Sequence, residues 1–312
     1  MARAELPPAR SVWTATPAGQ PQARVRLLGD AIVFACPGMR NTTQRHAATL
    51  LCSTDGQALQ VRCQGHTVQA PALLIAPMAC KTVDALDRPL LLIDLEPGHP
   101  HYRHFQALAA PGVQALQGAP CAALQDLGRA FAAGRLQGQA VDAQVREAVA
   151  ATARQLPQPA PLDPRVRKLM CLLDEDPGAE LERLAPLLGL SAHHASRLFH
   201  QGLGLPLRRY ALSIKIRAAA SFMGSGLALT QIAQAAGFVD SAHFAKVWAQ
   251  NYGAAPSRFF DTASTHIDQT DQPDWLLWYL AQRDRDLPPP AADAQTPWVH
   301  RSRTPRAPRP RT

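Results

Sequence analysis

Residues 184–199, with the sequence LAPLLGLSAHHASRLF, decide the fold of the C-terminal half of this chain. Apolar residues recur at helical spacing up to Leu188, and Gly189 then supplies a residue that tolerates a positive φ and ends the helix. Ser191 has the side chain of an N-cap, and the apolar positions of a second helix follow it. Two helices joined by a tight turn with a glycine form the pattern of a helix-turn-helix.

The same pattern occurs again in residues 232–248, with the sequence IAQAAGFVDSAHFAKVW. Gly237 ends the first helix of this unit and Asp240 caps the second. A helix of about 16 residues, and therefore about 24 Å, joins the two units, so the helices that follow Ser191 and Asp240 can stand about one DNA turn apart. Pro186 lies inside a predicted helix, where it removes a backbone hydrogen bond and favours a kink.

The outward faces of these two capped helices carry arginine and short polar groups, which suit base edges and phosphates in the major groove of DNA. The predicted DNA-binding residues are Ser191, His193, His194, Ser196, Arg197, His200, Ser241, Ala242, His243 and Lys246. For His193 a base contact and a solvated surface position are equally favoured. For Arg197 a contact with DNA is favoured over an internal salt bridge.

Taken in order, the motifs of residues 163–262 resemble the tandem helix-turn-helix domain of the AraC/XylS transcription regulators. The matching pieces are Leu184-Ala185, Gly189-Leu190-Ser191, Arg197-Leu198-Phe199, Gly204, Tyr210, Ile232-Ala233, Gly237-Phe238, Asp240, Phe244, Trp248, Tyr252-Gly253 and Pro256-Ser257. The resemblance implies that the helices after Ser191 and Asp240 are recognition helices and that double-stranded DNA is the partner. Lys246 stands where the family usually has arginine. Together with Ala242, Lys246 predicts that the second unit reads bases less well than the first, so we expect the first unit to dominate specificity.

Residues 21–156 have the pattern of a β-rich region followed by helices. Short apolar runs separated by Gly, Pro, Asp or Asn predict strands at 24–28, 31–35, 48–53, 58–63, 72–76 and 90–95. Apolar residues at helical spacing then predict two helices, near 122–133 and 141–156. Short strands at this spacing favour a small barrel or a sandwich.

This region resembles the cupin-like sensor domains that often precede such a DNA-binding domain. The resemblance rests on Arg45-His46, Gly56 and Leu74-Ile75-Ala76-Pro77. It implies a small-molecule effector bound in the barrel and a homodimer formed through the two helices, although their apolar stripes suit packing on the barrel equally well. RNA polymerase stays open as a further partner. We expect an α+β multidomain fold with a β-rich cupin-like barrel plus helices, then an all-α domain with two helix-turn-helix motifs joined by a long helix.

Five segments are predicted along the chain. They are a flexible leader at 1–20, a cupin-like ligand-sensing and dimerisation domain at 21–156, a Pro-rich linker at 157–162, an AraC-type DNA-binding domain at 163–262 and a largely disordered tail at 263–312. The linker prediction depends on Pro157, Pro159 and Pro161, which break any helix. The tail prediction depends on many prolines and arginines with little apolar surface to bury.

Composition excludes several classes of protein. Hydrophobic residues make up 46% of the chain, which excludes a wholly disordered protein. Apolar runs stay far below the roughly 18 residues that cross a membrane, and the N-terminus lacks the apolar core of a secretory signal. We therefore expect a cytoplasmic protein without a membrane partner. The net charge of +8 permits binding to nucleic acid. Six cysteines without a C-x-x-C pair predict reduced thiols, with a zinc site or a redox pair as the alternative.

Two alternatives to a sequence-specific regulator stay open. The first is a metal-dependent cupin-type enzyme, because imidazoles and carboxylates suit iron, zinc or manganese, and its candidate ligands are His46, His66, Glu96, His99 and His101. The order of these residues, Lys81 in place of a histidine, and the lack of a nucleophile set or phosphate loop argue against it. We expect no enzymatic activity, catalytic residue, metal or cofactor. The second is an interaction protein that has lost DNA binding, which Pro186, Ala242 and Lys246 keep open.

Overall fold

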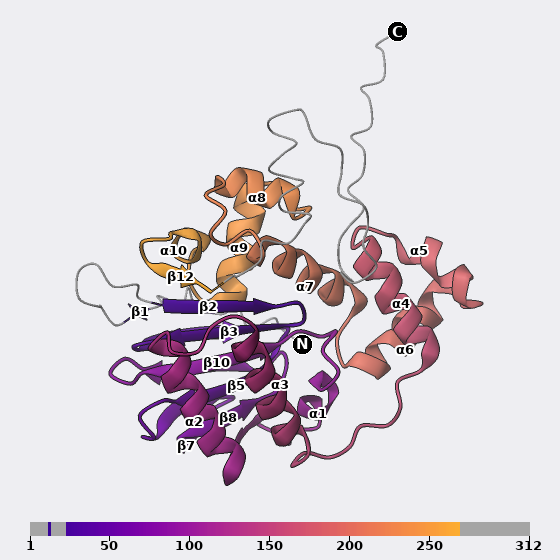
Figure 1. The fold of residues 1–312 in the computed structure, drawn as a ribbon. Helices are drawn as coiled ribbons and strands as arrows, with labels where there is room; N and C mark the ends of the chain where they lie inside the picture. The colour runs from indigo at the N-terminus through magenta and orange to yellow at the C-terminus, as the bar shows by residue number, and fades with distance from the viewer. Residues whose placement is uncertain (1–11, 14–22, 269–312) are drawn as a thin grey trace. The chain divides into compact units, whose positions relative to one another are not determined.

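The structure, a computed structural model, describes residues 12–13 and 23–268 (Figure 1). These residues divide into two compact units, one of residues 12–13, 23–161 and 215–268 and the other of residues 162–214. The division falls inside helix α7 (Leu207–Ala220), so the second helix-turn-helix belongs to the same unit as the β-sheets. The boundaries of the five sequence segments stay predictions, and most of the leader and tail lies outside the described residues.

The larger unit contains two sheets. The five-stranded sheet has the order β1-β4-β9-β6-β7 and the seven-stranded sheet the order β11-β8-β5-β10-β3-β2-β12. The strands are β1 (Val12–Trp13), β2 (Ala23–Leu28), β3 (Ala31–Cys36), β4 (Met39–Gln44), β5 (Ala48–Ser53), β6 (Leu59–Cys63), β7 (His66–Ala70), β8 (Ala72–Ile75), β9 (Cys80–Ala85), β10 (Leu90–Leu95), β11 (Val113–Ala115) and β12 (Thr265–Ile267).

The mixed α+β fold is confirmed, but across the described ranges the two sheets do not close into the barrel that the cupin resemblance implied. The outer edge of β2 is occupied by β12, which pairs with it in parallel, so β2 has no free edge in that region to offer the smaller sheet. The N-terminal region is therefore a pair of packed sheets.

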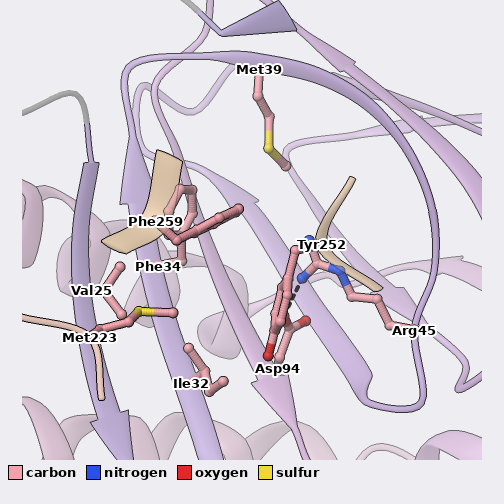
Figure 2. Close-up of a pocket in the computed structure, with 9 residues that line it drawn as sticks. All are labelled: Val25, Ile32, Phe34, Met39, Arg45, Asp94, Met223, Tyr252 and Phe259. Carbon is pink, nitrogen blue, oxygen red and sulfur yellow. Dashed lines mark hydrogen bonds and ion pairs between the residues drawn. The ribbon is translucent and has the colours of Figure 1, made fainter. Parts of the chain in front are cut away.

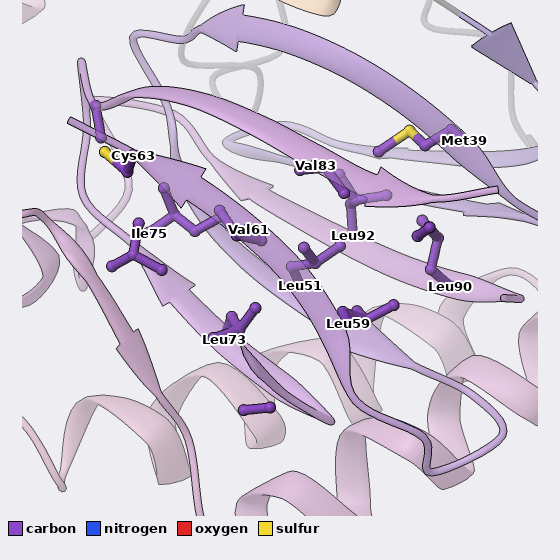
Figure 3. Packing of buried hydrophobic residues seen from close by; sticks show 14 of the residues in the cluster. Met39, Leu51, Leu59, Val61, Cys63, Leu73, Ile75, Val83, Leu90 and Leu92 are labelled. Atoms are coloured by element: carbon purple, nitrogen blue, oxygen red, sulfur yellow. The ribbon is translucent and has the colours of Figure 1, made fainter. Parts of the chain in front are cut away.

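The core lies between the two sheets (Figure 3). Leu51, Leu73 and Leu92 of the larger sheet pack there against Val61 and Val83 of the smaller sheet. Successive side chains of a strand point to opposite faces, so the remaining apolar residues of β5, β8 and β10 lie on the outer face of the larger sheet. All the residues of these three strands are buried, which requires a cover on that outer face too.

Helix α2 (Ala119–Ala132) supplies this cover by packing on β2, β3, β5 and β10, and α3 (Gln139–Ala153) packs on α2 (Figure 1). The apolar residues that predicted the two helices are all buried within the chain, namely Leu124, Leu127, Phe131, Val141, Val145, Val149 and Leu156. These stripes are therefore used for intramolecular packing, and the homodimer stays a prediction. A short helix α1 (Tyr102–Gln106) precedes them.

Gly128 allows α2 to lie close to the sheet. A Cβ at this position would stand 2.6 Å from Cγ2 of Thr54 and 3.1 Å from Cβ of Leu91. Gly128→Ala is expected to lower the free energy of unfolding by about 1–2 kcal/mol, because overpacking outweighs the gain of up to about 1 kcal/mol in helix propensity. Urea denaturation checks this. A stabilised variant would show that propensity dominates and that α2 does not pack this closely.

The C-terminal helices are α4 (Pro164–Glu175), α5 (Leu181–Leu184), the 3₁₀ helix η1 (Ala185–Leu188), α6 (Ala192–Leu203), α7, α8 (Leu229–Ala235), α9 (Ser241–Tyr252) and α10 (Pro256–Phe260). Asp163 caps α4, accepting a hydrogen bond from the backbone N–H of Arg165, with Pro164 in the first turn. Within residues 12–13 and 23–268, every helix is too short or too polar to cross a membrane.

Candidate nucleic-acid interface

The first helix-turn-helix unit consists of α5, η1 and α6. The α-helix gives way to 3₁₀ geometry next to Pro186, which has no N–H to continue the hydrogen-bond ladder. Gly189 adopts the left-handed conformation, with φ of 66°, and ends η1. The hydroxyl oxygen of Ser191 accepts a hydrogen bond from the backbone N–H of His194 at 3.3 Å and so caps α6. The predicted turn and cap are confirmed.

Helix α6 presents one polar face and one apolar face. Exposed on it are all the residues predicted to contact DNA in this unit, namely Ser191, His193, His194, Ser196, Arg197 and His200. His193, Arg197 and His200 are spaced by four and three residues and therefore share one side of the helix. On the buried side Phe199 packs edge to face on Tyr210, with ring centroids 5.4 Å apart. The buried side fixes α6 within its unit and leaves the polar face accessible.

The second helix-turn-helix unit consists of α8 and α9. Gly237 has φ of 76°, and a carboxylate oxygen of Asp240 accepts a hydrogen bond from the backbone N–H of His243 at 2.6 Å. The side chains of Ala242, His243 and Lys246 are exposed and that of Ser241 is half-buried. The imidazole of His243 packs against the ring of Phe238, with ring centroids 5.6 Å apart, and this contact restricts the orientation of the imidazole. The predicted cap and glycine turn are confirmed here too.

The back of α9 docks on the β-sheets of the same unit. Trp248, Tyr252 and Phe259 form an aromatic cluster, with the Trp248 and Tyr252 ring centroids 4.5 Å apart. The ring of Phe259 contacts that of Phe34 on β3, with ring centroids 6.1 Å apart. The side-chain amide of Asn41 on β4 donates a hydrogen bond to the carbonyl oxygen of Tyr252 at 3.5 Å. The second helix-turn-helix region thus contacts both sheets, through β3 and β4, and the polar face of α9 stays exposed.

A pocket lies at this contact (Figure 2). Val25, Ile32 and Phe34 line it from β2 and β3, and Met39 lines it from β4. Arg45 contributes from just after β4, Asp94 from β10, and Met223, Tyr252 and Phe259 from the C-terminal part. The cavity measures about 20 Å³. The sequence gives no sign that these residues form one group, because they come from segments far apart in the chain and most of them have the apolar spacing of ordinary core residues.

One end of the pocket carries a buried ion pair between Arg45 and Asp94 (Figure 2). The hydroxyl group of Thr49 donates to the second carboxylate oxygen of Asp94 at 2.6 Å. The guanidinium of Arg45 also lies over the ring of Tyr252, 5.5 Å from its centroid. The Nε atom of Arg45 is buried and has no hydrogen-bond partner among the described residues. The hydroxyl group of Tyr252, which also lines the pocket, is likewise buried without a partner among the described residues, so the pocket combines apolar walls with two side chains that have unused hydrogen-bonding capacity.

Two further ionisable groups are buried near this pair. The pKa of Lys81 is lowered to about 7, mainly by burial and also by the nearby charge of Arg45, while Asp94 opposes the shift. Burial raises the pKa of Glu96 to about 7, against the opposing effect of Arg217 on α7. Other groups that face Glu96 are Asp94, Arg45, Asp30, Tyr102 and Tyr252.

The buried carboxyl of Glu96 is expected to make stability depend on pH. Its pKa in the folded protein lies above the ordinary 4.5, so its contribution is complete below pH 4.5 and is lost as pH rises through about 7. The loss is on the order of 3 kcal/mol. Glu96→Gln should flatten the pH profile of the urea midpoint in that window relative to the unmodified protein. If the pH profiles of the two proteins run parallel, ionisation of Glu96 does not lower the free energy of unfolding.

The residues proposed as metal ligands do not form one cluster. His66 is exposed on β7, whereas His46 and Glu96 are buried at the ends of other strands. His99 and His101 lie before α1, with ring centroids 5.7 Å apart. In the part of the chain that the structure describes, no three His, Cys, Asp or Glu side chains are placed to hold a metal ion. All six cysteines are free thiols, and burial raises the pKa of Cys36 and of Cys52 to about 12.

Comparisons with known proteins agree with the presence of two helix-turn-helix units. A family model described as a helix-turn-helix domain matches residues 184–262. Among solved structures, the chain is similar to an apo variant of ToxT from Vibrio cholerae strain SCE256 (12% identity, TM-score 0.52, covering 74% of this chain and 97% of that one). It is also similar to ToxT from Vibrio cholerae O395 bound to (E)-4-(8-methylnaphthalen-1-yl)but-3-enoic acid (13% identity, TM-score 0.50, covering 78% and 98%). At these identities the likeness shows the fold alone.

A third solved structure is an AraC-type DNA-binding transcriptional regulator from Chromobacterium violaceum (22% identity, TM-score 0.30, covering 32% of this chain and 93% of that one). No curated protein sequence matches the chain. The family match spans both helix-turn-helix units, from Leu184 through α9 to the end of α10. The chain therefore carries an AraC-type helix-turn-helix domain at residues 184–262, which confirms the resemblance predicted from its motifs.

Proposed function

We propose that this protein is a sequence-specific transcription regulator whose DNA affinity is controlled by a small apolar effector with an acidic or hydrogen-bond-accepting group. The observation that carries the proposal is the pair of capped helices, α6 and α9, in a family-matched domain, each with an exposed polar face. A helix with arginine and short polar groups on its free face suits the major groove, and backbone amides and cations fix its register on phosphates.

The two helices have different roles in this proposal. Arg197 on α6 has the length and the fork of donors to bind a guanine edge with two hydrogen bonds. On α9 the predicted contact residues that are exposed are Ala242, His243 and Lys246, which offer fewer base-specific donors. The first unit therefore dominates specificity, and the second adds affinity. Because one chain carries both helices, two half-sites are contacted without a homodimer.

The pocket beside Arg45 is the proposed effector site. Its apolar walls suit a hydrocarbon body, and the unused Nε donor of Arg45 suits a carboxylate or another acceptor. The solved structure of ToxT that shares this fold binds a naphthyl carboxylic acid, and we infer a ligand of the same class here. Such a ligand changes DNA binding only by its differential affinity for two arrangements of the protein.

The proposal is tested by selecting genomic fragments with the purified full-length protein at physiological salt. The expected result is a shared motif of two short elements about one helical turn apart. Repeating the selection with 4-(1-naphthyl)butanoic acid should change the recovered amount of the same motif. If no motif is enriched with or without the acid, the regulator function is wrong. If a motif is enriched that the acid does not affect, only the effector class is wrong.

A further inference from the structure

The segment that follows the family-matched domain is attached to the sheet of the N-terminal region. Residues 265–267 form β12, which pairs in parallel with β2 so that Ile267 is opposite Val25 (Figure 1). Hydrogen bonds close the ladder at both ends. The backbone N–H of Ala23 donates to the carbonyl oxygen of Ser264 at 3.2 Å, and that of Asp268 donates to the carbonyl oxygen of Val25 at 2.7 Å. We call residues 264–268 the strap.

The end of the strap is also bound to the start of α3. A carboxylate oxygen of Asp268 accepts a hydrogen bond from the backbone N–H of Gly138 at 3.1 Å, and its carbonyl oxygen accepts from Nη1 of Arg26 at 2.8 Å. The same guanidinium donates twice to Asp142 in the first turn of α3, at 2.8 Å each. Asp268 is only 6% exposed and Arg26 only 7%. Buried, charge-assisted contacts of this kind are stronger than those of an exposed loop.

The strap is connected to both sides of the pocket that come from the C-terminal part. An added Cβ at Gly224, next to the pocket residue Met223, would lie 3.4 Å from Cγ1 of Ile267, so the strap packs against this turn. The hydroxyl of Thr265 donates to the carbonyl oxygen of Arg258, which precedes the pocket residue Phe259. On the sheet side, the strap pairs with Val25, which also lines the pocket.

The pocket is too small for an effector while the strap is in place. A cavity of about 20 Å³ holds about one water molecule, since a single water needs roughly 10–15 Å³ on this measure. A naphthyl acid therefore requires Met223 and Phe259 to move away from β2. The strap contacts both of these regions and pairs with β2 at the same time.

We propose that the strap is the latch of the effector pocket, and that its release from β2 is the step that lets a small apolar acid reach Arg45. This inference rests on the proposed function for the identity of the ligand, but the latch itself is a property of the fold. While the strap is paired with β2, it fixes the position of the second helix-turn-helix relative to the sheet. When the pocket is occupied, the second helix-turn-helix is held in a different position.

The test measures how often the pocket opens. Met223→Cys places a thiol in the pocket wall, in a background with Cys171→Ser because Cys171 is exposed. The rate at which iodoacetamide modifies position 223 in the full-length protein is followed by peptide mass mapping. Asp268→Pro removes both the N–H donated to Val25 and the carboxylate that accepts from Gly138. It is expected to accelerate modification at least tenfold.

His266→Ala is the matched control, because its side chain is exposed on the same strand, and it should leave the rate within twofold. A second variant tests the opposite direction without weakening the fold. Arg24 and His266 are paired in the register, and neighbouring strands stand about 5 Å apart, which a disulfide can span. With Arg24→Cys and His266→Cys oxidised, modification at position 223 should slow at least threefold and recover on reduction.

Equal rates in the released, control and cross-linked proteins, with unchanged circular dichroism, would overturn the latch. Protection of position 223 by 4-(1-naphthyl)butanoic acid in the Asp268→Pro protein supports both the latch and the ligand class. Acceleration without protection supports the latch and counts against the ligand class alone. None of these measurements uses DNA, so failure of the latch and failure of the regulator function are distinguishable.

Discussion

Replacing Asp94 with alanine is expected to lower the free energy of unfolding by about 3–5 kcal/mol, because it leaves the charge of Arg45 buried without its partner. The side chains of Arg45 and Asp94 are only 7% and 5% exposed, so water does not replace the lost carboxylate. The hydroxyl of Thr49 also loses its acceptor. The urea midpoint measures the change, provided that the slope of the transition stays that of the unmodified protein.

Two matched variants separate the buried charge from the loss of a side chain. Asp84→Ala removes the partner of Arg40 in an ion pair whose side chains are 26% and 48% exposed, and it should cost less than about 1 kcal/mol. Combining Asp94→Leu with Arg45→Met removes both buried charges and should recover most of the stability lost in Asp94→Ala. If the double variant is as unstable as the single one, packing at this site matters more than charge.

The strands that sequence analysis found and those it missed differ in their burial. Apolar runs predicted β2, β3, β5, β8 and β10 of the seven-stranded sheet, in which β5, β8 and β10 are buried throughout, and they also predicted β6 of the five-stranded sheet. The strands that it missed include β4, β7 and β9 of the five-stranded sheet, with the sequences MRNTTQ, HTVQA and CKTVDA. Their burial alternates or is low because one face is open to water, so their polar residues hid the strand pattern.

Local signals fixed the DNA-binding helices, whereas long-range contacts fixed the rest of the site. Gly189, Ser191, Gly237 and Asp240 each act within one turn of chain, so sequence alone located both capped helices. The pocket and the strap depend on residues more than 200 positions apart, such as Arg26 and Asp268. A three-residue strand such as β12 has no periodicity to detect. A usable signal was Asp94, a charged residue inside the apolar run that forms β10.

Arg197→Ala is expected to weaken binding to the selected motif by about 1–3 kcal/mol, which is roughly 5- to 150-fold, and to relax preference at one base pair. Arg197 is exposed and alanine is the best helix former, so the variant should keep the stability of α6. Affinities for the motif and for its single-base variants, measured by fluorescence anisotropy, give both the loss and the position at which specificity is lost.

The control is Arg146→Ala, which removes the same charge from an exposed position on α3, in the β-rich part of the chain. It should leave specific affinity within about twofold, whereas Lys246→Ala on α9 should show a smaller loss than Arg197→Ala. The salt dependence decides the kind of contact. A base contact leaves the slope of log affinity against log salt unchanged, whereas a phosphate contact lowers affinity for every sequence and reduces the slope by about one ion. Equal losses in the Arg197 and Arg146 variants would mean that α6 does not read the groove, because only the net charge would then matter.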